Sequence, residues 1–267
     1  MAFERNIIVA VDPTKDHQPA LELSANVMSI KIQDYDPTMC LLVGIDPASD
    51  NTRPDNPKVY RDSGYFQQII QRLNDANLKS KVRISWTKDW ADSLIYNAQE
   101  FEANSIMVSN PGVEGNREFS DEFWYLLRNS PVPVGLISNA DAPNCRNILL
   151  AIDFRDENLT ELNKRMLNMG RVMAKVYNSE LHIAHAYANS MQYPDRGRLG
   201  KALDIPNENI HLAEGTPEEA LRTISAELNP DAIILGASRR TGLRSALQGR
   251  KLSKILRNMK HNMYIVV

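Results

Sequence analysis

Two aspartates that close two nearly identical stretches are the first residues whose type and position suggest chemistry. Asp12 ends RNIIVAVD and Asp153 ends RNILLAID, and the stretches share Arg, Asn, Ile, Ala and Asp at matching positions. Short, continuous aliphatic runs predict buried parallel strands. An acid directly after such a strand lies at the sheet edge where α/β proteins bind ligands. Because no second titratable group accompanies either aspartate, we expect ligand or loop contacts here and predict no catalytic residue.

A basic stretch with three glycines is the second chemical feature. It reads GASRRTGLRSALQGRKLS, begins with Gly236 at the end of an expected strand, and enters a helix near Arg250. Glycines let backbone amides approach a ligand, and a helix N-terminus adds N–H donors and a positive dipole end. Together with the charges of Arg239 and Lys251, these features predict an anion site, most simply for phosphate. The alternative is a tight turn beside a solvated basic face.

Other kinds of site find less support. The basic stretch is neither a P-loop nor a dinucleotide fingerprint, and the chain has no G-x-S-x-G elbow. His182 and His185 are three apart on an expected strand, so they point to opposite faces and cannot share a metal, and we predict no metal site. Nucleic acid is not expected as a partner, because the basic stretch lacks interleaved aromatic residues and the chain has a net charge of −2.

The composition favours a globular protein of the cytoplasm. No apolar run approaches the ~18 residues of a membrane span, so we expect no membrane association. The first residues, MAFERN, do not form a signal peptide. Cys40 and Cys145 lack metal or redox spacing, which indicates reduced thiols. The two halves differ in charge, since residues 1–140 carry −6 and residues 141–267 carry +4.

The repeated stretches belong to a duplication that covers the chain. Asp12 and Asp153 are 141 residues apart, but Ser109 and Gly236, at the ends of the fourth strands, are 127 apart, so the second copy has lost about 14 residues. We place this loss after the second strand, where the first copy has an expected helix at 61–78 and the second only a short basic one. The expected strands are 5–12, 39–46, 81–86, 105–110 and 133–138, then 146–153, 181–188, 209–215, 231–237 and 263–267.

Strands that alternate with helices predict an α/β fold with right-handed crossovers and parallel sheets. We therefore expect two tandem domains, each a doubly wound open parallel sheet, at residues 1–138 and 146–267, with residues 139–145 as the linker. Two such halves with similar surfaces are expected to pack as an internal pseudo-dimer. The expected state is a monomer of this kind or a homodimer of such chains.

The order of these features resembles the universal stress proteins in their tandem form, whose domains have the HUP-type α/β fold. The resemblance is carried by AVDPTKDHQPAL, EGTPEEAL and AIILGASRRTGLRSALQG, and it extends over nearly the whole chain. It implies a cytoplasmic stress-response protein that works by regulatory binding. In that family, nucleotide-binding members carry Gly-x2-Gly-x9-Gly-Ser/Thr after the fourth strand. The first-strand aspartate and a second-strand residue then flank adenine and ribose.

Carried onto this sequence, the resemblance implies a nucleotide or another anionic ligand in the second half. Asp153 and Ala186 match the positions beside the adenosine, and Gly236 begins the glycine loop. Arg239 stands where the second glycine belongs, and Arg250 replaces the Ser/Thr. ATP is the implied cofactor, and Mg²⁺ is expected only if ATP binds. The implied site residues are Asp153, Ala186, Leu235, Gly236, Arg239, Gly249, Arg250 and Lys251.

The resemblance also implies that the first half no longer binds ATP. Ser109 replaces the first glycine, Gly112 keeps the second, and no terminal Gly-Ser/Thr pair follows. Acidic residues in the next segment would repel a triphosphate. The crevice of this half, formed by Asp12, Gly44, Ser109 and Gly112, could accept another ligand.

Two other functions stay open at this stage. One is a slow ATP hydrolase or nucleotide-dependent transferase of the wider adenine-nucleotide α/β group, although the chain lacks the SGG-type loop that pyrophosphate-releasing members place after the first strand. The other is a ligand-free scaffold that works through contacts with an unidentified protein partner. This reading gains weight if Arg239 fills the phosphate space.

Overall fold

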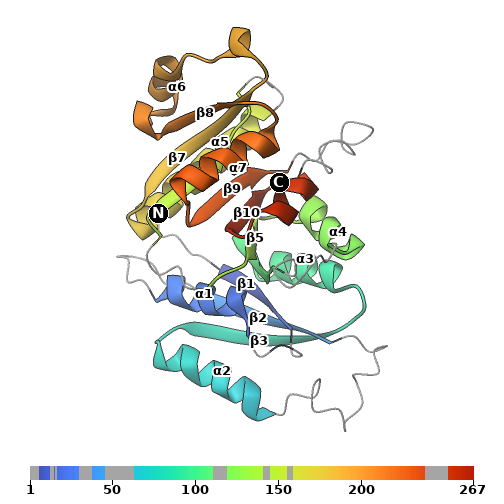
Figure 1. Cartoon of the computed structure of the whole chain (residues 1–267). Helices are drawn as coiled ribbons and strands as arrows, with labels where there is room; N and C mark the ends of the chain where they lie inside the picture. Colours follow the sequence, from blue (N-terminus) through green and yellow to red (C-terminus); the bar gives the residue numbers. More distant parts are fainter. Residues whose placement is uncertain are drawn as a thin grey trace. The chain divides into compact units, whose positions relative to one another are not determined.

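The computed structural model describes residues 6–12, 15, 17–29, 38–45, 63–110, 119–140, 145–154, 159–237 and 252–267, and the side chains of all of these except 45, 63–66 and 86. The chain divides into two compact units, Met1–Pro143 and Asn144–Val267 (Figure 1). The division falls inside the stretch that the sequence predicts to be a linker.

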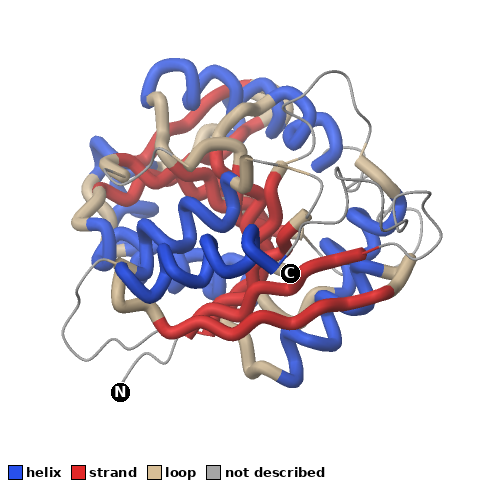
Figure 2. The backbone as a smooth tube through the Cα atoms, turned by 90° about the horizontal axis from the view of Figure 1, so that it is seen from below, coloured by secondary structure: helices blue, strands red, loops and turns tan. Residues whose placement is uncertain are grey.

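The first unit is a parallel sheet whose described strands are ordered β3-β2-β1-β4-β5. Strands β2 and β3 are added on one side of β1, and β4 and β5 on the other side. Right-handed crossovers therefore place α1 and α2 on one face of the sheet and α3 and α4 on the other. Figure 2 shows helices on both sides of the strands. The elements are β1 Asn6–Val11, α1 Pro19–Met28, β2 Thr38–Ile45, α2 Ser63–Asp75, β3 Lys79–Trp86, α3 Trp90–Glu100, β4 Ser105–Ser109, α4 Asp121–Asn129 and β5 Val134–Ile137.

The second unit repeats this plan, with its described strands ordered β10-β9-β6-β7-β8. A further helix at residues 252–258 precedes the last strand. The predicted α/β fold, with one parallel sheet in each half, is confirmed. The elements are β6 Asn147–Ala151, α5 Thr160–Tyr177, β7 Glu180–Tyr187, η4 Ser190–Gln192, α6 Arg196–Leu203, η5 Asn207–Asn209, β8 Ile210–Glu214, α7 Pro217–Leu228, β9 Ala232–Gly236 and β10 Asn262–Val266.

The strand registers show where the two copies correspond. Ile7 pairs with Ser105 in the first sheet, and Ile148 pairs with Ala232 in the second, which reproduces the offsets of 141 and 127 residues. The lost residues lie between the second and third strands, as predicted. There the first copy has the 13-residue helix α2, and the second has α6, which is only 8 residues long.

Local signals in the sequence account for the start of α7. Thr216 Oγ1 accepts a hydrogen bond from Glu219 N at 3.3 Å, and Glu219 Oε2 accepts one from Thr216 N at 2.9 Å. This reciprocal capping box satisfies two of the amides that a helix N-terminus leaves without partners. Pro217 occupies the first helical position, where no amide donor is needed. Residues 216–219 therefore determine where this helix begins.

At the amino ends of the sheets, each copy ties its fourth strand to its first. Asn104 Oδ1 accepts a hydrogen bond from Asn6 N at 3.0 Å in the first unit. In the second, Asp231 Oδ2 accepts from both Arg146 N and Asn147 N, at 2.7 and 3.0 Å. An ionised acceptor strengthens such bonds. The second copy therefore holds the start of its first strand more firmly than the first copy does.

The strands that form both cores are aliphatic and almost fully enclosed. Ile8 in β1 and Leu149 in β6 have no exposed surface, and the same holds for Ile106 and Ile233 in the fourth strands. Burial of such side chains contributes roughly 1.5–3 kcal/mol each. None of the helices in the described ranges combines the length and the apolar character that crossing a membrane requires.

Candidate functional site

The carboxyl ends of the central strands are the place to examine in each unit, because the strand order reverses there. In the second unit, β9, β6 and β7 are neighbours, and they bring Gly236, Asp153 and Ala186 to one edge of the sheet. Leu235 precedes Gly236 and is buried in the core. The other predicted residues of this site, Arg239, Gly249, Arg250 and Lys251, lie outside the described residues.

Asp153 is held through its backbone. Its carbonyl oxygen accepts a hydrogen bond at 2.9 Å from Nδ2 of Asn163, which is the fourth residue of α5. Beneath this loop, His185 is 2% exposed, and its Nδ1 lies 2.9 Å from the carbonyl oxygen of Ile152. The ring of Phe154 packs on the ring of His185 with centroids 5.3 Å apart. Sequence reasoning missed Asn163 and His185 as parts of this crevice.

Gly236 has a structural reason to be glycine. A Cβ atom at this position would lie 2.8 Å from Leu162 Cδ2 and 2.8 Å from Met166 Sδ. Both atoms belong to α5, which therefore packs directly against the end of β9. Such distances are shorter than van der Waals contact, so a side chain could enter only if α5 side chains moved. Packing against α5 is thus enough to explain this glycine. The absence of a side chain at Gly236 also leaves the end of β9 free of side-chain atoms.

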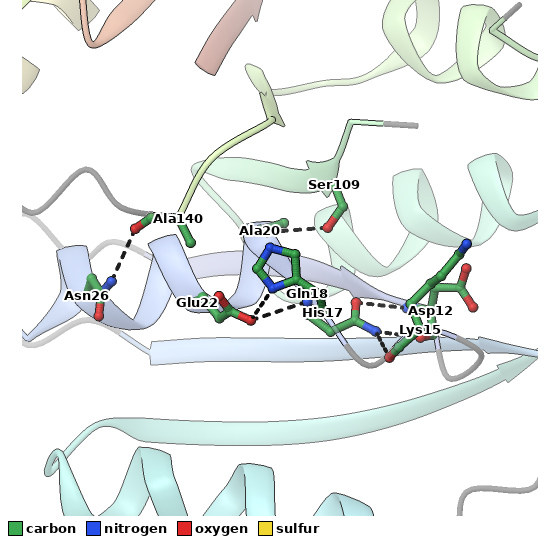
Figure 3. Close-up of polar contacts among 9 residues, drawn as sticks. All are labelled: Asp12, Lys15, His17, Gln18, Ala20, Glu22, Asn26, Ser109 and Ala140. Carbon is green, nitrogen blue, oxygen red and sulfur yellow. Dashed lines mark hydrogen bonds and ion pairs between the residues drawn. The ribbon is translucent and has the colours of Figure 1, made fainter. Parts of the chain in front are cut away.

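In the first unit, Gln18 folds back and binds the loop after β1 (Figure 3). Its side chain is 4% exposed. Nε2 donates to the carbonyl oxygens of Asp12 and Lys15, and Oε1 lies 3.4 Å from Asp12 N. Both copies therefore hold the carbonyl group of their first-strand aspartate with a side-chain amide. The amide comes from different positions, the N-cap of α1 here and the fourth residue of α5 in the second unit.

Ser109 binds one of the free amides at the N-terminus of α1. The Oγ atom of Ser109, at the end of β4, accepts a hydrogen bond from Ala20 N at 3.3 Å. The register places Ser109 at the position that Gly236 occupies in the second unit. Gly44 in β2 has open space around its Cα, with nothing within 4 Å of a Cβ built there. Gly112, the remaining predicted residue of this crevice, lies outside the described residues.

A carboxylate also occupies the N-terminus of α1. Glu22 is the fourth residue of the helix, and its Oε1 lies 3.3 Å from Gln18 N and 3.0 Å from His17 Nδ1 (Figure 3). The equivalent residue of α5 is Asn163, which has no charge. A carboxylate is favourable beside a helix N-terminus, and it takes the place that an anionic ligand would otherwise use. At this helix position the first crevice therefore carries a negative charge and the second does not.

The described histidines do not assemble a metal centre. No group of three or more His, Cys, Asp or Glu side chains among the described residues is arranged to hold a metal ion. His182 and His211 do face each other across β7 and β8. This pair could not be recognised from the residues alone, because it depends on the register of two strands that a helix separates in the chain.

A family profile matches the second half of the chain. Residues 144–266 match the Universal stress protein family. Along its full length the chain is similar to curated proteins called universal stress protein E. The relative from Photorhabdus laumondii is 23% identical over 97% of this chain and 94% of its own length. The one from Escherichia coli K12 is 20% identical over 100% of this chain and 95% of its own length.

Solved structures share the fold of the whole chain. A putative universal stress protein from Pseudomonas aeruginosa has a TM-score of 0.80 at 18% identity, over 99% of this chain and 94% of that one. A universal stress protein from Archaeoglobus fulgidus has a TM-score of 0.72 at 15% identity, over 97% and 95%. At these identities the likeness concerns the fold alone.

Proposed function

Because residues 144–266 match the Universal stress protein family and the whole chain is similar to proteins called universal stress protein E, we propose that it is a regulatory binding protein of the stress response whose second domain holds a nucleotide or another phosphate-bearing anion. The first domain serves as a structural partner whose crevice does not take such a ligand. Regulation through binding, and not turnover, is the proposed role.

One observation carries this proposal: equivalent helix positions hold Glu22 in the first domain and Asn163 in the second. Glu22 places a negative charge at the N-terminus of α1, where it would repel a phosphate. Asn163 leaves the matching position of α5 uncharged. The acidic residue in the first turn of α5, Glu161, is paired with Lys164 Nζ at 2.7 Å, so an anion at the second crevice meets a helix N-terminus whose described carboxylate already has a cationic partner.

The exchange at the fourth strand supports the same assignment. Ser109 Oγ accepts a hydrogen bond from Ala20 N in the first turn of α1, whereas Gly236 has no side chain to direct at α5. The basic residues of the stretch that follows Gly236 in sequence, Arg239, Arg250 and Lys251, supply positive charge to the second half. ATP with Mg²⁺ suits such a site, and so does a smaller phosphate-bearing ligand.

The proposal also assigns the protein to the cytoplasm. Cys40 and Cys145 are free and buried. Burial raises the pKa of both thiols, that of Cys145 to about 11. Thiols that stay protonated at neutral pH react slowly with oxidants, and unpaired cysteines suit a reducing compartment.

A second candidate function is a ligand-free scaffold that acts through protein contacts. The close packing of Leu162 and Met166 against Gly236 favours it, because that packing explains the glycine without a ligand. The two candidates differ in a measurable way. A binding protein is stabilised by its ligand, whereas a scaffold without a ligand is not.

Thermal unfolding of the full chain with and without millimolar Mg-ATP tests the proposal, with pyrophosphate as the probe for a smaller anion. A ligand at 100 times its Kd adds about 2.7 kcal/mol, which raises the Tm by about 5 °C. We expect Asn163→Asp to abolish this shift, because it adds charge at constant shape. Asn163→Ala, which removes the bond to Asp153 without adding charge, should keep part of it, and Glu22→Gln should keep all of it. No shift with either probe would rule the proposal out in favour of the scaffold.

A further inference from the structure

Two histidines of the second domain form a close pair at the edge of its sheet. His182 Nδ1 in β7 lies 3.1 Å from His211 Nε2 in β8, and the ring centroids are 5.3 Å apart. His182 is 6% exposed, and His211 is half-buried. Ala184 pairs with His211, so the two imidazoles lie diagonally on one face of neighbouring strands. Because β8 ends the strand order of this unit, β7 is its only described strand partner.

The surroundings keep both imidazoles neutral near pH 7. Burial lowers the pKa of His182, His211 lowers it further, and Glu180 opposes this with a carboxylate oxygen 3.6 Å from His182 Nε2. Burial also lowers the pKa of His211, with Arg196 of α6 acting in the same direction and Glu227 of α7 opposing. Two neutral imidazoles at 3.1 Å share one N–H···N hydrogen bond.

The first domain has no such pair at the equivalent place. The registers match His182 with Cys40 and His211 with Arg83. Burial raises the pKa of the Cys40 thiol, so the position that matches His182 stays uncharged between pH 5 and 8. Arg83 instead donates to Asn97 Oδ1 at 2.8 Å. Any acid response of the paired strands is therefore confined to the second domain.

We propose that His182 and His211 form an acid-released latch between β7 and the edge strand β8. When the pair takes up a proton, a charge forms in a half-buried site. A second proton would place two like charges 3.1 Å apart. Beside the pair, Asn209 Nδ2 reaches the carbonyl oxygen of Leu181 at 3.4 Å, which is a long hydrogen bond. The start of β8 thus depends on the neutral pair.

The direction of the effect follows from proton linkage. A detached β8 exposes both imidazoles and restores their ordinary affinity for protons, so the detached state binds more protons than the attached state. Attachment is therefore fully favourable above a pH of about 6.5 and weakens as the pH falls below it. This inference does not depend on nucleotide binding by the second domain.

Hydrogen exchange of the full chain at pH 7.5 and 5.5, corrected for intrinsic exchange rates, measures the latch. We expect protection of residues 210–214 to fall about tenfold at pH 5.5, since this pH lies about one unit below the ordinary histidine pKa that the detached strand regains. The matching strand β3 of the first domain serves as the internal control and should change little. His211→Gln, which cannot take up a proton, should remove most of the pH dependence, and His17→Gln, at an exposed histidine, should not.

Several outcomes would overturn the latch. Equal loss of protection in β3, or an unchanged pH dependence in His211→Gln, would show that the pair is not responsible. If that variant does not fold, an NMR titration of the unmodified protein decides, because either imidazole titrating above pH 6.5 contradicts the proposal. Protection of β8 by added Zn²⁺ in the unmodified protein but not in His211→Gln would identify the pair as a cation site instead.

Discussion

The two crevices of this duplicated chain sit on matching strands but differ at the positions that decide charge and space. Glu22 and Ser109 bring oxygen atoms to the N-terminus of α1, and both accept hydrogen bonds from its amides or its cap. Their counterparts in the second domain are Asn163 and Gly236, an uncharged side chain and no side chain. The two copies keep the same scaffold and differ in a few side chains at its edge.

The two crevices also share one hydrogen bond. In both copies a side-chain amide holds the carbonyl oxygen of the first-strand aspartate, although Gln18 and Asn163 occupy different helix positions. The same bond was thus kept by different means. We infer that the conformation of this loop matters to the fold itself, whether or not a ligand binds beside it.

The largest expected difference between the copies concerns the end of the fourth strand. Gly236→Val would force its side chain against Leu162 and Met166 and should destabilise the protein by about 3 kcal/mol through overpacking. Ser109→Ala, at the equivalent position, removes only one capping bond to Ala20 N and should cost about 1 kcal/mol. Urea unfolding of both variants checks the order. If Gly236→Val left the free energy of unfolding unchanged, α5 would not pack on β9 as described.

The ties at the amino ends give a smaller contrast. Asp231→Ala leaves the amides of Arg146 and Asn147 without their charged acceptor and should cost about 2 kcal/mol. Asn104→Ala removes a neutral acceptor from one amide, Asn6 N, and should cost about 1 kcal/mol. Both free energies of unfolding come from denaturant titration. Equal costs would show that the charge and the second bond of Asp231 contribute nothing.

Much of the scaffold could be predicted from the sequence. The aliphatic runs that end at Asp12 and Asp153 indicated first strands, and the change of offset between them and the pair Ser109 and Gly236 located the shortened crossover. The helix cap at Thr216 can also be recognised in the sequence, since capping depends on residues only three apart. These features are local or periodic, so they are visible in one chain.

The contacts that distinguish the two crevices were not predictable in the same way. Asn163 reaches Asp153 across a loop, and His182 meets His211 only because β7 and β8 are adjacent in one register. Comparing the copies at the offset of 141 residues would have aligned Glu22 with Asn163, and this was the one signal available. The predicted loop residues from Arg239 to Lys251 lie outside the described residues, so their roles stay predictions.

Counting bound ligand tests the central claim, that the second crevice accepts a phosphate-bearing anion and the first is closed by its own side chains. Equilibrium dialysis of the full chain with Mg-ATP, and in parallel with pyrophosphate, gives the number of sites. We expect one equivalent per chain, lost in Asn163→Asp and kept in Glu22→Gln. Two equivalents, or one equivalent that survives Asn163→Asp, would contradict it.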